Sequence, residues 1–329
     1  MRRAAALALT LALSAGPGVA RAQDGFGSFR GVAAAEGVRV GVVAGGAPVA
    51  NQVVDGASPI AQAELDSTNG SSAFASVAYP GDVVVTAPGL VAGFSGGQTS
   101  DVIPAYPLIA IAGSTTVPES TAEAPGVAMR AEGTDTKAAA ATTAGPGSPE
   151  GTATVTTTAA VERLAGGEVV ARATSQVAAV TIGPLVLGRV TAGSEATRDG
   201  AGALTRASSF EAGALTVDGV GVRLTPEGLV VGETNVPVEA SPLQPVLDEA
   251  RISLRYLAPR DTEDGVISAG LVVSKVQDLP GAITPVVASF TFGRASAGVS
   301  GVALPGEIVD GGFLPPSPAG TGGEIPTPA

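Results

Sequence analysis

Apolar and polar side chains alternate along much of this chain. One example spans residues 186–197, where the even positions up to 196 form a small, mostly apolar face: Val186, Gly188, Val190, Ala192, Ser194 and Ala196. Residues 169–179 repeat the pattern, with apolar or small side chains at the odd positions. A period of two residues is the spacing of side chains on one face of a strand. We therefore expect antiparallel strands with one face packed and the other in water.

Turn signals and one helical segment complete the prediction of the fold. Beyond residue 126, most turn signals are separated by stretches of roughly 12 to 16 residues, longer than the usual strand. Asp199-Gly200 and Asp264-Gly265 each lie between two such stretches, as tight hairpins require. Pro242 precedes apolar residues at three- and four-residue spacing, which predicts a short helix that gives way to a strand near Arg251. The predicted class is mainly β, with long antiparallel, hairpin-linked strands in a meander, sandwich or curved sheet and one short helix.

The pattern changes along the chain. Residues 23–144 hold short strand candidates between many Pro and Gly residues, so we expect a loop-rich β region there. Residues 145–312 form the long-strand region, with the helix near 242–250. The stretch 144–151 either links two domains or forms the longest turn of one meander, and we favour the single domain. The Pro- and Gly-rich tail at 313–329 is expected to be disordered.

The N-terminus resembles an export signal. Arg2 and Arg3 precede the apolar run 4–15, and Ala20-Arg21-Ala22 forms a small-x-small cleavage site, which places the cut between Ala22 and Gln23. The apolar run is roughly half the length of about 20 residues that a membrane-spanning helix needs. We expect residues 1–22 to be a signal peptide, the mature chain to lack a transmembrane segment, and the protein to be secreted or held in the cell envelope.

The composition excludes several classes of function. The chain contains no His, Cys or Trp, which removes triad hydrolases, thiol chemistry, imidazole metal ligands, iron–sulfur clusters and disulfides. Its formal net charge is −12, and without three leader arginines the balance is 15 − 30 = −15. Such a chain is a poor partner for nucleic acid or an anionic membrane surface. Neither a dinucleotide fingerprint nor a phosphate loop occurs, and we expect no cofactor.

The remaining polar residues allow a few site hypotheses. A carboxylate-dependent glycosidase needs two acidic residues in one cleft, and the candidates are Glu119 with Glu123 or the loop at 261–264. That loop offers oxygen ligands for calcium from Asp261, Glu263 and Asp264, but the same residues form a good hairpin turn without metal. We therefore predict no catalytic residues and no metal site, with these three carboxylates as the candidate ligands if one exists. Both lysines, at 137 and 275, are expected to be solvated strand residues.

Several short segments carry a family resemblance. They are VTIGPLVLG at 180–188, DGVGVRLTPEG at 218–228, ARISLRYLAP at 250–259, AYPGD at 78–82 and AYPL at 105–108. Together they resemble a group of uncharacterised secreted proteins of high-GC Gram-positive (actinobacterial) bacteria. The resemblance implies export and a β-rich architecture. None of the segments implies a reaction.

Three functions remain open from the sequence. The leading hypothesis is a secreted, non-enzymatic β-rich protein that acts as a structural or interaction module with an envelope or extracellular partner. The alternative is a carrier for a lipid or another apolar ligand, since long strands with one apolar face can curl around such a molecule. The third is the carboxylate-dependent glycosidase. Whether the Ala- and Val-rich faces meet tightly or enclose a cavity distinguishes the carrier from the module.

Overall fold

The computed structural model is mainly β, with 72% of the described residues in strands and 4% in helices, which confirms the expected class. It describes residues 26–44, 52–77, 109–145, 154–225, 228–232, 236–278 and 284–303. The predicted signal peptide, the cleavage site between Ala22 and Gln23, and the tail at 313–329 lie outside the described residues.

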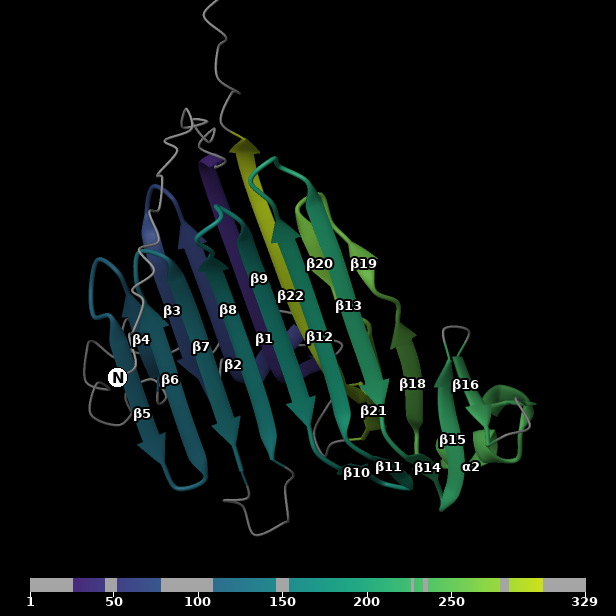
Figure 1. The fold of residues 1–329 in the computed structure, drawn as a ribbon. Coiled ribbons are helices and arrows are strands. Elements are labelled where there is room, and N and C mark those ends of the chain that lie inside the picture. The colour runs from purple at the N-terminus through teal and green to yellow at the C-terminus, as the bar shows by residue number, and fades with distance from the viewer. Residues whose placement is uncertain are drawn as a thin grey trace, which may run out of the picture.

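Two large antiparallel sheets face each other (Figure 1). Sheet A contains, in spatial order, β18 (Ile252–Leu257), β21 (Gly270–Gln277), β22 (Val286–Ala303), β1 (Phe26–Ala44), β2 (Gln52–Asp66), β3 (Gly70–Ser76) and β4 (Ile109–Gly113). The short hairpin of β19 (Arg260–Asp261) and β20 (Gly265–Ile267) joins sheet A, where β20 pairs with β22. Sheet B contains β13 (Leu204–Ala212), β12 (Val190–Arg198), β9 (Val169–Val177), β8 (Val155–Arg163), β7 (Lys137–Ala144), β6 (Val127–Gly133) and β5 (Glu119–Ala124).

A third, smaller sheet lies at one end of this sandwich. Sheet C contains β10 (Val180–Ile182), β11 (Leu185–Leu187), β14 (Leu215–Val217), β15 (Val220–Thr225), β16 (Gly228–Val231) and β17 (Val236–Pro237). The 3-10 turn η1 (Val238–Ala240) and the single α-helix of the described residues, α2 (Leu243–Glu249), follow it. Leu243 and Leu247 of α2 are buried, so the helix covers the end of the second hydrophobic core described below.

Strands from distant parts of the sequence pair with one another. The first strand, β1, lies beside the last, β22, and their pairing runs from Phe26 opposite Ala303 to Ala44 opposite Val286 (Figure 1).

The consecutive strands β7 and β8, on either side of residue 145, are neighbours in sheet B. They pair from Lys137 opposite Glu162 to Ala144 opposite Val155. Residue 145 therefore follows a strand inside sheet B, and the regions on either side of it share both large sheets.

Very small side chains fill the space between sheets A and B. Fully buried alanines meet there from both layers, including Ala35 and Ala61 of sheet A and Ala131 and Ala196 of sheet B. Where β4 faces β6, the backbones are so close that a Cβ on Gly133 would lie 2.5 Å from the Cα atom of Gly113. Carbon atoms normally approach to about 3.5–4.0 Å, so only glycine fits at this position. The inner faces of the two sheets therefore meet tightly here.

Hydroxyl groups also connect the two layers. Thr142 Oγ1 of β7 donates a hydrogen bond of 2.9 Å to the backbone oxygen of Ile60. Ser175 Oγ of β9 donates to the oxygen of Glu36 at 2.7 Å. Ser194 Oγ of β12 donates to the oxygen of Ala295 at 3.0 Å. Such short side chains reach the opposite backbone only because the sheets lie so close together.

A crease crosses sheet A where Pro59, Gly37 and Gly293 lie opposite one another on β2, β1 and β22. Gly293 has φ +76°, a left-handed conformation that favours glycine. On one side of the crease, the buried side chains of β22 are at odd-numbered positions, such as Ala295. On the other side they are even-numbered, such as Phe292. The strands therefore turn a different set of side chains inward beyond the crease.

An ion pair on β1 gives independent evidence for this change of phase. Glu36 Oε1 and Arg39 Nη1 lie 2.9 Å apart, although residues three apart in a regular strand point to opposite faces. Arg294 of β22, opposite Glu36 in the register, also lies near the carboxylate, with 4.0 Å between its Nε and Glu36 Oε2. These contacts place Glu36, before the crease, and Arg39, after it, on the same outer face.

Beyond the crease the core changes character. The buried side chains there are larger, and they form a second hydrophobic cluster that includes Phe292, Leu271, Val273, Ile252 and Leu247. Leu271 and Phe292 are opposite each other on β21 and β22, and both are almost completely buried. The molecule thus has a thin alanine core and a thicker Val, Leu and Phe core, which includes side chains from all three sheets and α2.

One expected strand is divided in two. Residues 186–197 were predicted to form one face of a single strand, but β11 belongs to sheet C and β12 to sheet B. Val186 is 39% exposed while Leu185 and Leu187 are buried, the reverse of the prediction. The break lies at Gly188, where a Cβ would approach the Ala214 oxygen to 2.7 Å, so the close crossing of two backbones requires glycine. The odd, inward positions of β9 from Val169 to Val177 are confirmed, whereas Ala179, expected on the same face, lies beyond the strand and is exposed.

Other local predictions are confirmed with small changes. The helix begins after Pro242, and Arg251, at φ +52°, ends it before β18. The hairpin between β12 and β13 forms at Asp199, but the glycine with positive φ is Gly202 rather than Gly200. In the region expected to be loop-rich, β1 has 19 residues and β2 has 15, so its first strands are longer than the Pro and Gly content suggested.

Candidate functional site: an apolar cavity at the end of the sandwich

A hollow bounded largely by apolar side chains lies beyond the crease, between residues of sheets A, B and C. It has a volume of about 540 Å³ and is lined by residues of β10 and of one end of β21. The residues that line it are Val38, Val155, Val177, Val180, Thr181, Ile182, Gly183, Lys275, Gln277, Ala288, Phe290 and Phe292. Small-molecule sites typically enclose about 300–1,000 Å³ and combine apolar walls with a few polar groups, which this hollow also does.

Each wall of the cavity comes from a different part of the fold. Val38 and Phe290 project from sheet A, and they point inward because they lie on the far side of the crease, where the even-numbered positions face inward. Val155 and Val177 come from β8 and β9 of sheet B, at the positions where these strands pair with each other. After Val177 the chain leaves sheet B, and β10 forms a further wall. The cavity thus lies where sheets A and B and strand β10 of sheet C meet.

The turn after β10 is fixed against sheet A. Gly183 has φ +59°, and a Cβ added to it would lie 3.3 Å from Cδ1 of Ile252. Ile252 is opposite Lys275 in the pairing of β18 with β21. This packing holds the β10–β11 hairpin beside the cavity.

Among the described residues that line the cavity, Lys275 is the charged one. It is half-buried, and on β21 it lies on the same face as Leu271 and Val273, which are both 0% exposed. No carboxylate among the described residues lies within ion-pair distance of its ammonium group. Lys137, by contrast, pairs with Glu132 at 3.0 Å. Both lysines are partly exposed strand residues, and Lys275 differs from Lys137 in that it lines the cavity.

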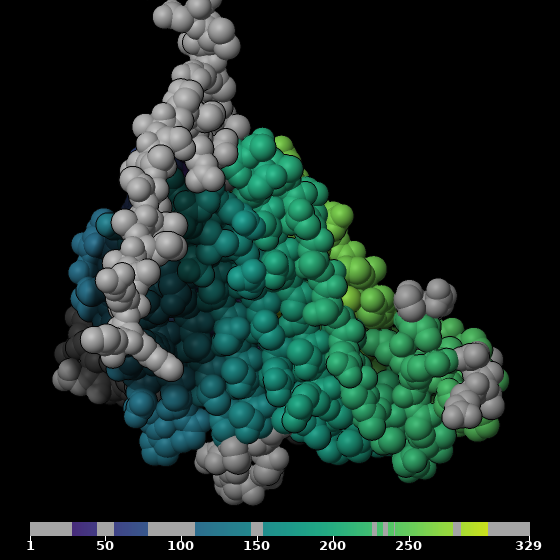
Figure 2. All heavy atoms as spheres, in the orientation of Figure 1, coloured from purple at the N-terminus to yellow at the C-terminus, as the bar shows by residue number. Residues whose placement is uncertain are grey.

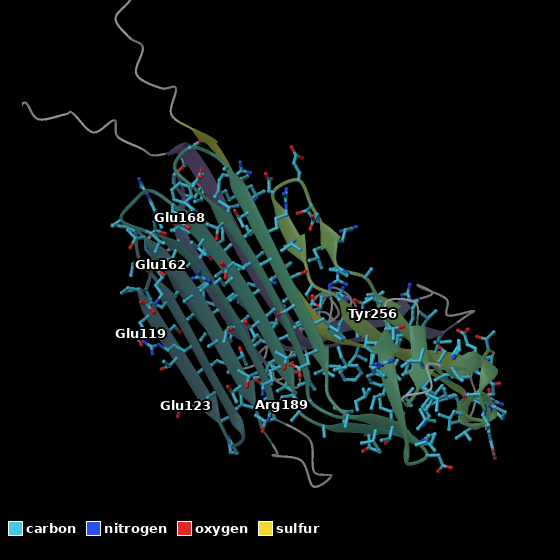
Figure 3. All side chains as sticks on the ribbon, turned by 45° about the vertical axis from the view of Figure 1, so that its right-hand side comes forward. Glu119, Glu123, Glu162, Glu168, Arg189 and Tyr256 are labelled. Atoms are coloured by element: carbon cyan, nitrogen blue, oxygen red, sulfur yellow. The ribbon has the colours of Figure 1, made fainter. Side chains whose placement is uncertain are left out.

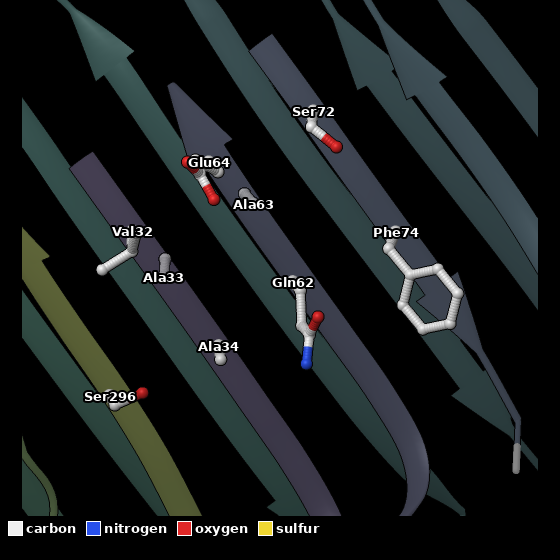
Figure 4. A pocket seen from close by; sticks show the side chains of 9 residues that line it. All are labelled: Val32, Ala33, Ala34, Gln62, Ala63, Glu64, Ser72, Phe74 and Ser296. Carbon is white, nitrogen blue, oxygen red and sulfur yellow. The ribbon is translucent and has the colours of Figure 1, made fainter. Parts of the chain in front are cut away.

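A second hollow, of about 240 Å³, lies on the outer face of sheet A (Figure 4). Gln62, Glu64 and Phe74 project from β2 and β3 above small residues of β1 and β22. The carboxylate of Glu64 is already engaged, because its Oε1 lies 2.7 Å from Nε of Arg30. This hydrogen-bonded ion pair raises the pKa of Arg30. The hollow follows a flat strand surface and is smaller and more polar than the end cavity.

The outer face of sheet B is closely packed and polar. Figure 2 shows the side chains of β8, β9, β12 and β13 covering this face side by side. Arg172 and Glu195 form a cross-strand pair on it at 2.7 Å, and the hydrogen bond to Glu195 raises the pKa of Arg172. Neither residue contacts the end cavity.

The carboxylates proposed for a glycosidase lie on the edge of the molecule. Glu119 and Glu123 are exposed on β5, and Figure 3 shows them along this edge strand, far from Tyr256. Four residues along a strand correspond to about 13 Å, more than the roughly 10 Å that an inverting pair spans. Glu119 also pairs with Arg130 at 3.0 Å.

The acidic loop at 261–264 is held by arginines of sheet B. Arg206 donates hydrogen bonds to the backbone oxygens of Thr262, Glu263 and Gly265, at 2.9, 2.7 and 3.0 Å. Arg198 Nη2 lies 3.4 Å from Oδ1 of Asp264. Asp261 and Glu263 are exposed, and the described residues contain no group of three or more acidic side chains placed to hold a metal ion. The oxygens that calcium would need are thus partly occupied by guanidinium groups.

Two further findings concern the chain as a whole. Among the helices that the structure describes, none has the length and apolar character needed to cross a membrane. In comparisons with known proteins, no family model, no curated protein and no solved structure gives a significant match to this chain. The resemblance to secreted actinobacterial proteins therefore stays a prediction.

Proposed function

We propose that this protein is a non-enzymatic binding protein of the cell envelope or extracellular space that holds an apolar ligand in the end cavity. The observation that carries the proposal is the cavity of about 540 Å³ between Val38, Ile182 and Phe290. Burial of apolar surface yields about 25 cal/mol per Å², so such walls favour an apolar ligand over water. The predicted export signal supports the location.

The packing of the two sheets limits where a ligand can bind. The inner faces of sheets A and B meet through alanines and glycines in van der Waals contact, so the first core has no room for a guest. Apolar side chains of both of these sheets line the end cavity, so the sheets leave space between them there. This is why we prefer the carrier to a purely structural module, which is the second candidate function.

The tight alanine core is the specific observation that favours a structural or interaction module. A thin sandwich with hydroxyl groups hydrogen-bonded across it is a stable scaffold without any ligand. A carboxylate-dependent glycosidase ranks last, because Glu119 and Glu123 lie exposed on an edge strand.

Native mass spectrometry of protein purified from its own host tests the proposal. A carrier should retain an apolar molecule and should also bind a neutral apolar probe, such as a long-chain alcohol, in titration calorimetry. The variant Ala288→Phe, which places a ring in the cavity, should weaken probe binding, whereas Ala207→Phe on the exposed face of β13 should not. Absence of both a co-purified ligand and probe binding would refute the carrier and leave the structural module.

A further inference from the structure

We infer that the cavity takes an amphipathic anion, a single alkyl or acyl chain with an acidic headgroup, and that Lys275 binds the headgroup. This inference rests on the proposed function, because it specifies which apolar ligands the same cavity prefers. Its starting point is the juxtaposition of walls of Val, Ile and Phe with an ammonium group that has no acidic partner among the described residues.

The position of Lys275 on its strand is the first argument. Along β21 the inward side chains run from Leu271 through Val273 to Lys275 and then to Gln277 at the end of the strand. The strand therefore changes from completely buried apolar residues in the second core to the polar residues Lys275 and Gln277, which line the cavity. A chain that lies along the Val, Ile and Phe side chains of the cavity, with its polar end near Lys275 and Gln277, matches this arrangement.

The charge balance around the cavity is the second argument. A charge beside apolar walls gains from a partner, because such walls solvate it less well than water does. Lys275 has no acidic partner among the described residues, whereas Lys137 has Glu132. An anionic headgroup would supply the missing counter-charge, and charge-assisted hydrogen bonds are among the strong ones.

The negative net charge of the protein makes a local cation necessary for binding an anion. With a formal charge of −12, the chain as a whole repels anions. A site for an anion therefore needs a local cation, and among the described lining residues Lys275 is that cation. A neutral ligand would give its ammonium group no counter-charge.

Titration calorimetry with two matched ligand series tests the inference. Alkyl carboxylates and primary alcohols of the same chain length are compared below their micellar concentrations. Within each series, affinity should rise about fourfold for each methylene that enters the cavity and then level off. At equal length the carboxylate should bind at least about tenfold more tightly than the alcohol.

Two lysine variants locate the effect. Lys275→Gln should remove the advantage of the carboxylate and leave alcohol binding unchanged. Lys137→Gln is the matched control, because it removes the other lysine, on β7 of sheet B, and should change neither series. If alcohol and carboxylate bind equally to the unaltered protein, the headgroup inference is wrong while the carrier remains. If neither binds, both proposals fail.

A second measurement needs no variant. Because the chain has only two lysines, acetylation of each can be followed by mass spectrometry. A saturating alkyl carboxylate should slow acetylation of Lys275 and leave Lys137 unaffected. Equal rates with and without ligand would overturn the inference.

A further set of titrations distinguishes the chemical classes that could supply the anionic headgroup. Monomeric alkyl carboxylate and monomeric alkyl phosphate distinguish a free acid from a phosphorylated lipid as the preferred ligand. Anionic phospholipid vesicles are the third ligand in this arm. Binding to vesicles alone, without binding of either monomer, would contradict a single-chain site in the cavity.

Discussion

Two neighbouring threonines in the core between the sheets should respond in opposite ways to the same substitution. Thr142 on β7 and Thr157 on β8 are directly opposite each other in the register, and both are 0% exposed. The Thr142 hydroxyl donates to the oxygen of Ile60 at 2.9 Å, whereas Oγ1 of Thr157 is buried without any hydrogen-bond partner. Valine has nearly the shape of threonine without the hydroxyl, so Thr→Val isolates the contribution of each group.

The expected free energies follow from these contacts. Thr142→Val loses a net hydrogen bond and should destabilise the protein by about 1 kcal/mol. Thr157→Val removes a buried, unsatisfied hydroxyl and should stabilise it by about 1 kcal/mol or more, since such groups cost about 1–3 kcal/mol. For a chain of this size each kcal/mol shifts Tm by about 2–4 °C, so the two variants should differ by roughly 4–8 °C.

Differential scanning calorimetry of the full chain measures this difference, with far-UV circular dichroism as the control for unchanged strand content. The unaltered protein should melt between the two variants. If both variants shift Tm in the same direction, hydroxyl hydrogen bonding between the sheets does not have the role that we assign to it.

Three further predictions concern packing and charge. Gly133→Ala should destabilise the protein by about 1–3 kcal/mol, because the added Cβ overpacks against Gly113. In the control variant Gly221→Ala the added Cβ meets nothing within 4 Å, so the stability should change by less than about 1 kcal/mol. Equal melting temperatures of the two variants would show that the sheets have room for the Cβ at Gly133. Phe292→Ala should cost about 3–5 kcal/mol in chemical denaturation, because the ring is 1% exposed in the second core, and a loss below about 1 kcal/mol would contradict that packing. Hydrogen bonds from the backbone N–H groups of Asn69 and Thr68 lower the pKa of Asp66. The ionised carboxylate therefore stabilises the fold above the usual aspartate pKa of about 3.9, and this contribution is lost as the pH falls through the lower pKa of the folded state. A titration midpoint of Asp66 at or above about 3.9, measured by NMR, would contradict this prediction.

Local signals along the sequence predicted the local structure. The spacing after Pro242 predicted α2, and Asp199 with its following glycines predicted the hairpin between β12 and β13. The alternation in β9 predicted its buried face because no break interrupts that strand. These features depend on residues close in sequence, so propensity and periodicity are sufficient to identify them.

The crease and the exchange of strands between sheets were not predictable in this way. The crease requires Gly37, Pro59 and Gly293 to lie side by side, and the sequence separation of the first and last hides this relation. The break at Gly188 depends on the close approach of Ala214, which is also a tertiary contact.

The candidate site was missed for a related reason. Lys275 follows Leu271 and Val273 at a spacing of two, so the sequence did place it on an apolar face. Solvation was nevertheless the ordinary expectation for a strand lysine, because nothing in the sequence shows which inward faces are separated. The local signal was present, but the cavity depends on how Val38, Val155 and Phe290 meet from three strands.

The pairing of the first strand with the last also determines how the molecule would respond to force. Phe26 and Ala303 are opposite each other, so the first and last described residues lie at the same end of the β1–β22 pair. Pulling on these two points would load the backbone hydrogen bonds between β1 and β22 one pair at a time, as in a zipper, rather than all together in shear. The sandwich would therefore open at low force from this end, while the cavity, near the far end of β22, would be among the last parts of this seam to separate.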